Sequence, residues 1–201
     1  MKRNLSWVCL CLTFLIVGFL SGRISSPTES QGKYLANGQY SVSHVTDGDT
    51  FVFLSGRDKE KARLMGINTP ETKDPRTEVQ CFGPEAADTV KQLLDTRTVR
   101  LEFNVWVRDR KAGSPTNKRD KYGRLLVYVY TTQAIRLSNG TQLPQGLLVN
   151  QWLIQEGYAR EDAYGDTHRL KDKFETAEAH AKATSKGMWK NPACAKESNR
   201  S

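Results

Sequence analysis

The stretch Asp47–Leu54 (DGDTFVFL) decides the fold class, because it joins a turn directly to a strand. Asp-Gly is a favoured pair in tight hairpin turns, since both residues tolerate the backbone angles that such turns need. The segment that follows, Thr50–Leu54, is rich in the β-branched and aromatic residues that are enriched in strands. A shorter, mixed strand over Gln39–Val45 precedes the turn. The sequence therefore predicts a β-hairpin at the start of the folded region.

Three further strands are predicted after this hairpin. They cover Lys61–Ile67 (KARLMGI), Val99–Val107 (VRLEFNVWV) and Arg124–Tyr130 (RLLVYVY). The second of them alternates between apolar and polar residues, as a half-buried strand does. The segment Arg108–Lys121 is charged and contains glycine and proline, so it is predicted to be a loop.

Three helices are also predicted. The first runs from about Pro84 to Leu94, because proline suits the first turn of a helix. The second covers Leu147–Glu156 and is followed by Gly157, a residue type that commonly ends helices. The third begins after Thr167. Apolar residues at helical spacing are expected to be buried, namely Ala86, Val90, Leu93 and Leu94 in the first helix and Leu170, Phe174, Ala177 and Ala181 in the third. Short strands with one helix among them and two helices after them are typical of an α+β domain, mainly β, with a small antiparallel sheet or barrel.

A hydrophobic segment precedes this domain. Lys2 and Arg3 are followed by Leu5–Leu20 (LSWVCLCLTFLIVGFL). A positive start before an apolar run is typical of a secretory signal or of an N-terminal membrane anchor, and both readings stay open. We expect residues 1–22 to be this segment, 23–38 a polar linker, 39–190 the folded domain and 191–201 a polar tail. The domain is thus expected outside the cytoplasm, either secreted or anchored to the membrane.

The composition narrows the classes of protein to consider. The chain has 201 residues, of which 26% are charged and 38% hydrophobic, which excludes a multi-span membrane protein and a largely disordered one. Thirty Lys and Arg against 22 Asp and Glu give a net charge of +8, which favours a polyanionic partner such as nucleic acid or an anionic membrane. Cys81 and Cys194 are the two cysteines of the folded region. In an exported domain they could form a disulfide or stay two separate thiols.

Three groups of polar residues could carry chemistry. The first is Asp47–Thr50 (DGDT), the second is Arg63 followed by Asn68–Glu71 (NTPE), and the third is Asp120–Arg124 (DKYGR). Each group by itself is no more than an ordinary turn, loop or charged strand end.

Taken together, these three groups have an order and spacing that resembles the staphylococcal nuclease (thermonuclease) family. The segments Cys81–Ala86 (CFGPEA) and Leu148–Ala159 (LVNQWLIQEGYA) are similar to that family as well. The likeness extends over roughly Tyr40–Trp189. It implies a five-stranded OB-fold barrel with three helices, and a calcium-dependent endonuclease that hydrolyses DNA and RNA with little sequence specificity. We expect the protein to be a monomer.

The resemblance also assigns roles to individual residues. The catalytic residues that it implies are Arg63, Glu71 and Arg124. The calcium ligands that it implies are Asp49, Asn68 and the backbone carbonyl of Thr69, with Asp47 beside them. The substrate-binding residues are expected to be Lys121, Tyr122 and Tyr164, and packing of the tyrosine rings in the core is the alternative.

The residue types suit this chemistry on their own terms. Two guanidinium groups can hold the oxygens of a phosphodiester by charge-assisted hydrogen bonds and stabilise the charge of the transition state. A glutamate can take a proton from the attacking water or position that water. Calcium prefers oxygen ligands, and Asp49, Asn68 and Thr69 offer only oxygens. The family often has Asp where this chain has Asn68, so we expect weaker calcium binding.

Two other classes of protein remain as alternatives. An OB-fold module without catalytic activity could bind single-stranded nucleic acid through a basic groove and aromatic side chains. Such a module would not need the acid Glu71. A protein whose basic face binds anionic lipid would explain the hydrophobic start but none of the three groups.

Overall fold

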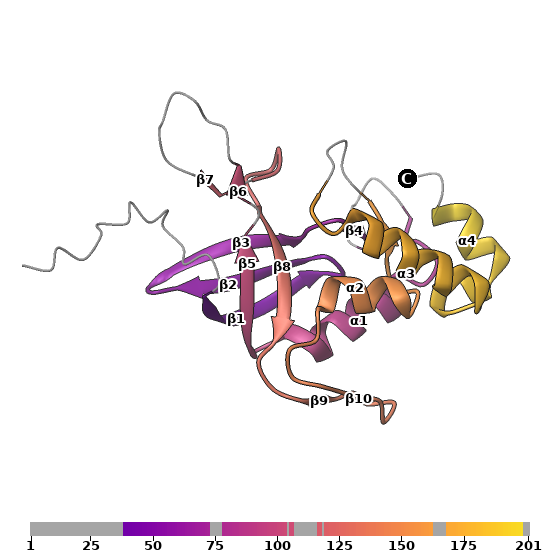
Figure 1. Cartoon of the computed structure of the whole chain (residues 1–201), viewed down its shortest axis with the longest axis horizontal. Coiled ribbons are helices and arrows are strands. Elements are labelled where there is room, and N and C mark those ends of the chain that lie inside the picture. The colour runs from indigo at the N-terminus through magenta and orange to yellow at the C-terminus, as the bar shows by residue number, and fades with distance from the viewer. Residues whose placement is uncertain are drawn as a thin grey trace, which may run out of the picture.

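Five strands form a closed barrel in the order β1-β2-β3-β8-β5, and helices gather at one end of it (Figure 1). The computed structural model describes residues 38–72, 78–103, 105–106, 116–117, 119–162 and 168–198. The barrel strands are β1 Gln39–Asp47, β2 Thr50–Ser55, β3 Asp58–Leu64, β5 Thr98–Phe103 and β8 Leu125–Thr131. The helices are α1 Gly83–Leu94, α2 Val149–Gln155, α3 Lys171–Ala183, the 3-10 helix η1 Gly187–Lys190 and α4 Pro192–Ser198.

Six shorter strands form three two-stranded sheets beside the barrel. Strand β4 pairs with β11, β6 with β7, and β9 with β10. Their bounds are β4 Ile67–Asn68, β6 Val105–Trp106, β7 Thr116–Asn117, β9 Ile135–Arg136, β10 Gln142–Leu143 and β11 Arg160–Glu161.

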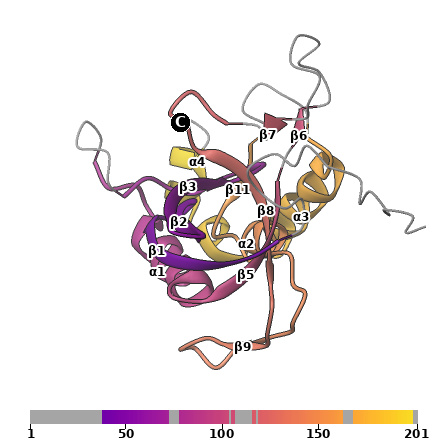
Figure 2. The same ribbon diagram turned by 90° about the vertical axis from the view of Figure 1, so that its left-hand side faces the viewer.

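The barrel closes through one parallel pair of strands. Neighbouring strands of the barrel, seen in Figure 2, are antiparallel except β3 and β8. In that pair Arg63 lies beside Leu126. The predicted fold class, an α+β and mainly β domain with a five-stranded OB-fold barrel and three helices, is confirmed, and η1 and α4 add to it. The parallel pair brings the residues of β3 next to the segment that opens β8.

Two predicted strands have different limits in the structure. The strand expected over residues 61–67 starts earlier and ends at Leu64, because Gly66 has a φ of +75° and turns the chain before β4. The strand expected over residues 99–107 is divided. Its first part, β5, pairs with β8 inside the barrel, whereas β6 pairs with β7 outside it. Alternation of apolar and polar residues cannot show where a strand changes its partner.

The core fills the barrel and the space between the barrel and the helices. Tyr40 meets Phe53 and Phe103 edge-on, with ring centroids 5.2 and 5.7 Å apart. The apolar residues predicted to face inward from α1 and α3 are all buried. Helix α2 is tied to the barrel by the buried Asn150, which accepts a hydrogen bond from Val129 N (2.9 Å) and donates to Met65 O (3.0 Å).

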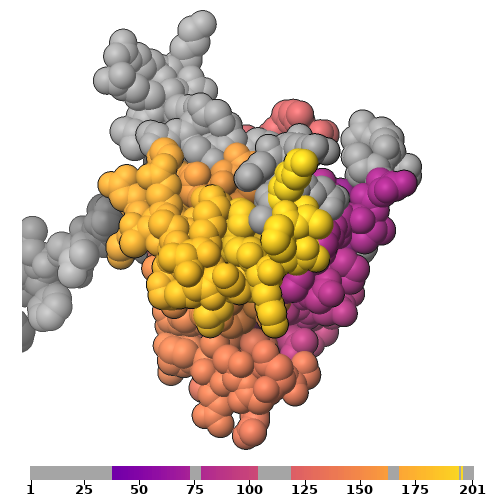
Figure 3. All heavy atoms as spheres, turned by 90° about the vertical axis from the view of Figure 1, so that its right-hand side faces the viewer, coloured from indigo at the N-terminus to yellow at the C-terminus, as the bar shows by residue number. Residues whose placement is uncertain are grey.

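The C-terminal helices α3 and α4 form much of the surface on the right-hand side of Figure 1, which faces the viewer in Figure 3. Helix α4 lies within the predicted polar tail, and Cys194 in α4 forms a disulfide with Cys81, with their Cα atoms 5.1 Å apart. The disulfide, one of the two outcomes left open by the sequence, is therefore present.

Residues 1–37, which include the predicted signal or anchor and almost all of the predicted linker, lie outside the described residues. Among the helices of the described part of the chain, none has the length and apolar character of a membrane span.

Candidate active site

The turn between β1 and β2 brings the first two groups of polar residues together. Strands β2 and β3 pair with Thr50 directly opposite Arg63, and Leu64 N donates a hydrogen bond to Asp49 O over 2.8 Å. The backbone of Asp49 therefore lies beside the end of β3 that carries Arg63.

Asp49 and Arg63 form a buried ion pair. Arg63 Nη1 lies 2.6 Å from Asp49 Oδ2, and each side chain is only 6% exposed. Burial raises the pKa of Asp49 above its ordinary value, while the positive charge of Arg63 and a hydrogen bond from Thr50 act in the opposite direction. Arg63 Nη2 also donates to Asn68 Oδ1 over 3.0 Å. One guanidinium thus connects two of the residues predicted to bind calcium.

The third predicted ligand, Thr69, packs against the same turn. A Cβ atom on Gly48 would lie 2.5 Å from Thr69 Oγ1, so the absence of a side chain at Gly48 lets the turn approach Thr69 closely. The three residues offer a carboxylate, an amide oxygen and a backbone carbonyl, which are the hard oxygen donors that calcium prefers. No group of three His, Cys, Asp or Glu side chains that could hold a metal occurs among the described residues. A cation here would depend on neutral oxygens as much as on carboxylates.

Arg124 approaches the same turn from the segment that opens β8. Its Nε lies 2.6 Å from Asp120 Oδ2, and its Nη1 donates to Thr50 Oγ1 over 2.9 Å. Thr50 Oγ1 donates in turn to Asp49 Oδ1 over 2.8 Å. The polar contacts therefore run without a break from Asp120 through Arg124, Thr50, Asp49 and Arg63 to Asn68, and they connect all three groups of the sequence.

Glu71 lies in the loop after β4, next to this network. Its Oε1 accepts a hydrogen bond from Thr72 N over 2.9 Å, and Thr72 Oγ1 donates to Asp47 Oδ1 over 2.7 Å. Burial raises the pKa of Asp47, and the neighbouring carboxylate of Glu71 raises it further, while hydrogen bonds from Thr72 and Gly48 oppose the shift. Asp47 is thus joined to the Glu71 loop through Thr72.

Two of the three predicted substrate-binding residues, Lys121 and Tyr122, are exposed beside Arg124. Tyr122 is 66% exposed, with its ring centroid 5.2 Å from Arg124 Cζ and 5.1 Å from Lys121 Nζ. Such an exposed ring beside two cations offers a face on which a base can stack. Tyr164 lies outside the described residues, so its predicted role stays a prediction.

Four residues of the site had no separate assignment from the sequence. Asp120 orients Arg124, Thr50 joins Arg124 to Asp49, and Thr72 joins Glu71 to Asp47. The fourth, Gln80, accepts a hydrogen bond from Glu71 N at its Oε1 over 2.8 Å. Asp120 and Thr50 belong to the groups DKYGR and DGDT, which is a signal that could have identified them. Nothing in the sequence marks Gln80.

Comparison with known proteins shows the family of the chain. Residues 61–191 match the family described as "Staphylococcal nuclease homologue". The chain is 32% identical to a thermonuclease of Staphylococcus hyicus over 168 residues, which cover 83% of this chain and 85% of the relative. It is 29% identical to a thermonuclease of Staphylococcus intermedius over 182 residues, covering 90% and 93% of the two chains. It is 30% identical to the endonuclease YncB of Bacillus subtilis over 168 residues, covering 83% and 68%. The chain therefore belongs to the staphylococcal nuclease family.

Proposed function

We propose that this protein, a nuclease of the staphylococcal nuclease family, hydrolyses phosphodiester bonds of DNA and RNA with little sequence specificity and depends on calcium. The continuous polar network between Asp120 and Asn68 carries the proposal, because it brings Arg63 of β3 and Arg124, the residue before β8, to the same turn. All these residues belong to one chain, so a monomer is sufficient for activity.

The two arginines supply the electrostatic part of catalysis. Water attack on a phosphodiester concentrates negative charge on the oxygens around phosphorus. Arg63 and Arg124 are already oriented by carboxylates, Asp49 and Asp120, so little reorganisation is needed when that charge develops. Arg124 stands nearer the surface and contacts the incoming phosphate first, beside the exposed ring of Tyr122 and the ammonium group of Lys121.

Glu71 handles the proton of the attacking water, as general base or by orienting that water. Gln80 bonds its backbone and Thr72 N donates to its carboxylate, so that carboxylate is presented from a defined position. Asp49, Asn68 and the carbonyl of Thr69 are the residues that would hold calcium, which would act on the phosphate as a Lewis acid.

A direct assay separates this proposal from a catalytically inactive nucleic-acid-binding module. Purified protein is incubated with labelled DNA and RNA oligonucleotides across a calcium titration, and binding and product formation are measured in the same samples. We expect cleavage of both substrates with calcium and none with excess EGTA. Tight binding with no product at any calcium concentration would support the inactive module.

The substitution Asn68→Asp should lower the calcium concentration needed for half-maximal activity. The change is nearly isosteric and adds one negative charge to a proposed ligand, and ligand charge is a main determinant of calcium affinity. Because dehydration of the new carboxylate offsets part of the Coulomb gain, we expect about tenfold tighter binding, or roughly 1.4 kcal/mol. Calcium titration of wild type and variant measures the shift, and an equal or higher requirement in the variant would show that Asn68 is not a ligand.

We also propose that residues 1–22 direct the nuclease domain out of the cytoplasm. A non-specific nuclease kept inside the cell would attack the genome of its own cell, and the segment has the positive start and apolar run of an export signal. Cell fractionation with a C-terminal epitope should place the protein in the membrane pellet if the segment is an anchor, and in the medium if it is cleaved. A full-length product found only in the soluble cytoplasm would contradict export.

A further inference from the structure

We propose that the disulfide between Cys81 and Cys194 holds Glu71 in its working position, so that reduction of this disulfide lowers turnover. The inference rests on the role of Glu71 in the proposed function. It adds a positioning device and a redox dependence to that role.

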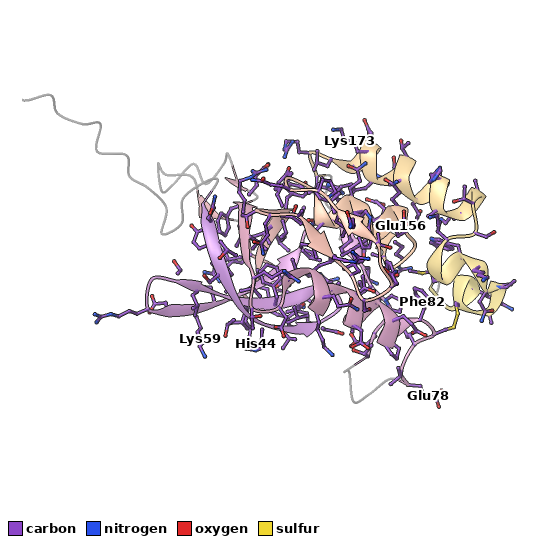
Figure 4. All side chains as sticks on the ribbon, turned by 90° about the horizontal axis from the view of Figure 1, so that it is seen from below. His44, Lys59, Glu78, Phe82, Glu156 and Lys173 are labelled. Carbon is purple, nitrogen blue, oxygen red and sulfur yellow. A yellow bond between two sulfur atoms is a disulfide. The ribbon has the colours of Figure 1, made fainter. Side chains whose placement is uncertain are left out.

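The disulfide fixes Cys81 to a well-anchored part of the fold. Cys194 is buried in α4, which packs against η1. Helix η1 lies against the segment that follows α2, where Met188 N donates to Gly157 O over 3.0 Å and Met188 is buried. Figure 4 shows these C-terminal helices (yellow) on the same side of the molecule as the labelled Glu78 and Phe82. The bond therefore ties the start of α1 to the C-terminal end of the chain.

The residue next to Cys81 holds the backbone of Glu71. Gln80 N donates to Glu71 O over 2.9 Å, and Glu71 N donates to Gln80 Oε1 over 2.8 Å. The first residue of α1, Gly83, packs against the same place, since a Cβ atom there would lie 2.7 Å from Thr72 Cγ2 and 3.1 Å from Glu71 O. The backbone position of Glu71 is thus set by residues 80–83, which the disulfide secures.

The conformation of Phe82 shows that this segment needs external support. Phe82 has a φ of +69°, in the left-handed region that residues other than glycine rarely adopt. Its ring stacks on Tyr158 with centroids 5.6 Å apart, and Tyr158 stacks on Trp152 at 5.7 Å. A strained backbone of this kind persists only where several contacts impose it. The disulfide at Cys81 is one of them, and its loss allows Phe82 to relax and Gln80 to shift.

Reduction by a dithiol is chemically balanced. The reductant supplies two electrons and two protons, the bond between the two sulfur atoms breaks, and Cys81 and Cys194 become thiols while the dithiol becomes its own cyclic disulfide. Disulfides persist outside the cytoplasm and are rare inside it. A nuclease with this device is most active where the disulfide forms, and export of the domain, as proposed above, would place it there.

Steady-state kinetics on the full chain, with and without dithiothreitol, test the inference. We expect reduction to lower kcat about tenfold through misplacement of Glu71, with KM and the calcium requirement unchanged. Cys194→Ser should have the low kcat of the reduced enzyme and should not respond to dithiothreitol, which assigns the effect to this disulfide rather than to Cys9 or Cys11. A kcat that is the same before and after complete reduction would overturn the inference.

Two further variants keep the test decisive if Cys194→Ser does not fold. Gln80→Ala retains the disulfide but removes the bond to Glu71 N, and it should lower kcat to a similar extent. Gln92→Ala is the matched control, because Gln92 Oε1 also accepts a loop N–H, from Ser138 over 2.7 Å, but on a different part of α1. It should keep wild-type kcat. Equal turnover in both glutamine variants would contradict the inference.

The Glu71→Gln background separates this inference from the proposed function. If the disulfide acts through Glu71, reduction should have almost no further effect on the low residual kcat of Glu71→Gln. If reduction lowers kcat by the same factor in both backgrounds, the disulfide has a general structural role, and the inference is overturned. Wild-type activity of Glu71→Gln would instead refute the role of Glu71 in the proposed function.

Discussion

Replacing Arg124 with Ala, or Glu71 with Gln, should each lower kcat by about 10²–10³-fold while the protein stays folded. Arg124 is held by Asp120 and Thr50 at the surface end of the network, so its removal takes away a charge already aimed at the phosphate. Glu71→Gln keeps the size of the side chain and removes its ability to accept a proton. Steady-state kinetics with DNA, together with circular dichroism of each variant, measure the effect.

An arginine outside the site provides the matched control for Arg124. Arg136 is exposed in β9. The hairpin of β9 and β10 follows the end of β8 that lies away from Arg124 (Figure 1). Arg136→Ala removes the same charge from the whole molecule and should leave kcat unchanged. Near-normal turnover of both Arg124→Ala and Glu71→Gln would remove these residues from the mechanism.

Replacing Arg63 with Met should destabilise the protein by about 3–5 kcal/mol, in addition to abolishing most activity. The ion pair between Arg63 and Asp49 is almost completely buried, with each side chain 6% exposed. Loss of the guanidinium leaves the largely buried carboxylate of Asp49 without its closest opposite charge. Urea unfolding at equilibrium gives the change in the free energy of unfolding.

The double variant Arg63→Met with Asp49→Asn tests the cause of that loss. With the buried charge also removed, part of the stability should return, because no unpaired carboxylate remains. Lys91→Met is the control for an exposed pair, since Lys91 contacts Asp88 where both side chains are in contact with solvent, and it should change stability only slightly. An equally small effect of Arg63→Met would show that the buried pair does not stabilise the fold.

Local patterns in the sequence predicted much of the fold. Pro84 and the apolar spacing after it define α1, and Gly157, with a φ of +73°, follows the end of α2 as expected. The division between β5 and β6 could not be predicted, because the choice of pairing partner depends on residues far along the chain. Helix α4 was missed for a different reason, since a short polar segment shows no clear periodicity.

The candidate site shows the same difference between local and distant information. Each of the three groups DGDT, NTPE and DKYGR is a continuous stretch of sequence. Their order along the chain identified the residues that the structure brings together. The contacts of Gln80 and Cys81 depend on which distant residues meet them, namely Glu71 and Cys194. Sequence alone could therefore name the residues proposed to act on the substrate, but not the contact by which Gln80 holds Glu71 in place.

Digestion of closed circular DNA tests the central claim most directly. Wild type and Arg124→Ala are incubated with such DNA in calcium, in EGTA, and in EGTA followed by excess calcium. The account predicts that wild type opens and degrades the circles in calcium, stops in EGTA and resumes when calcium is restored, while Arg124→Ala leaves them largely closed under all three conditions. Circles that stay closed with active-site residues intact and calcium present, or equal cleavage by wild type and Arg124→Ala, would contradict it.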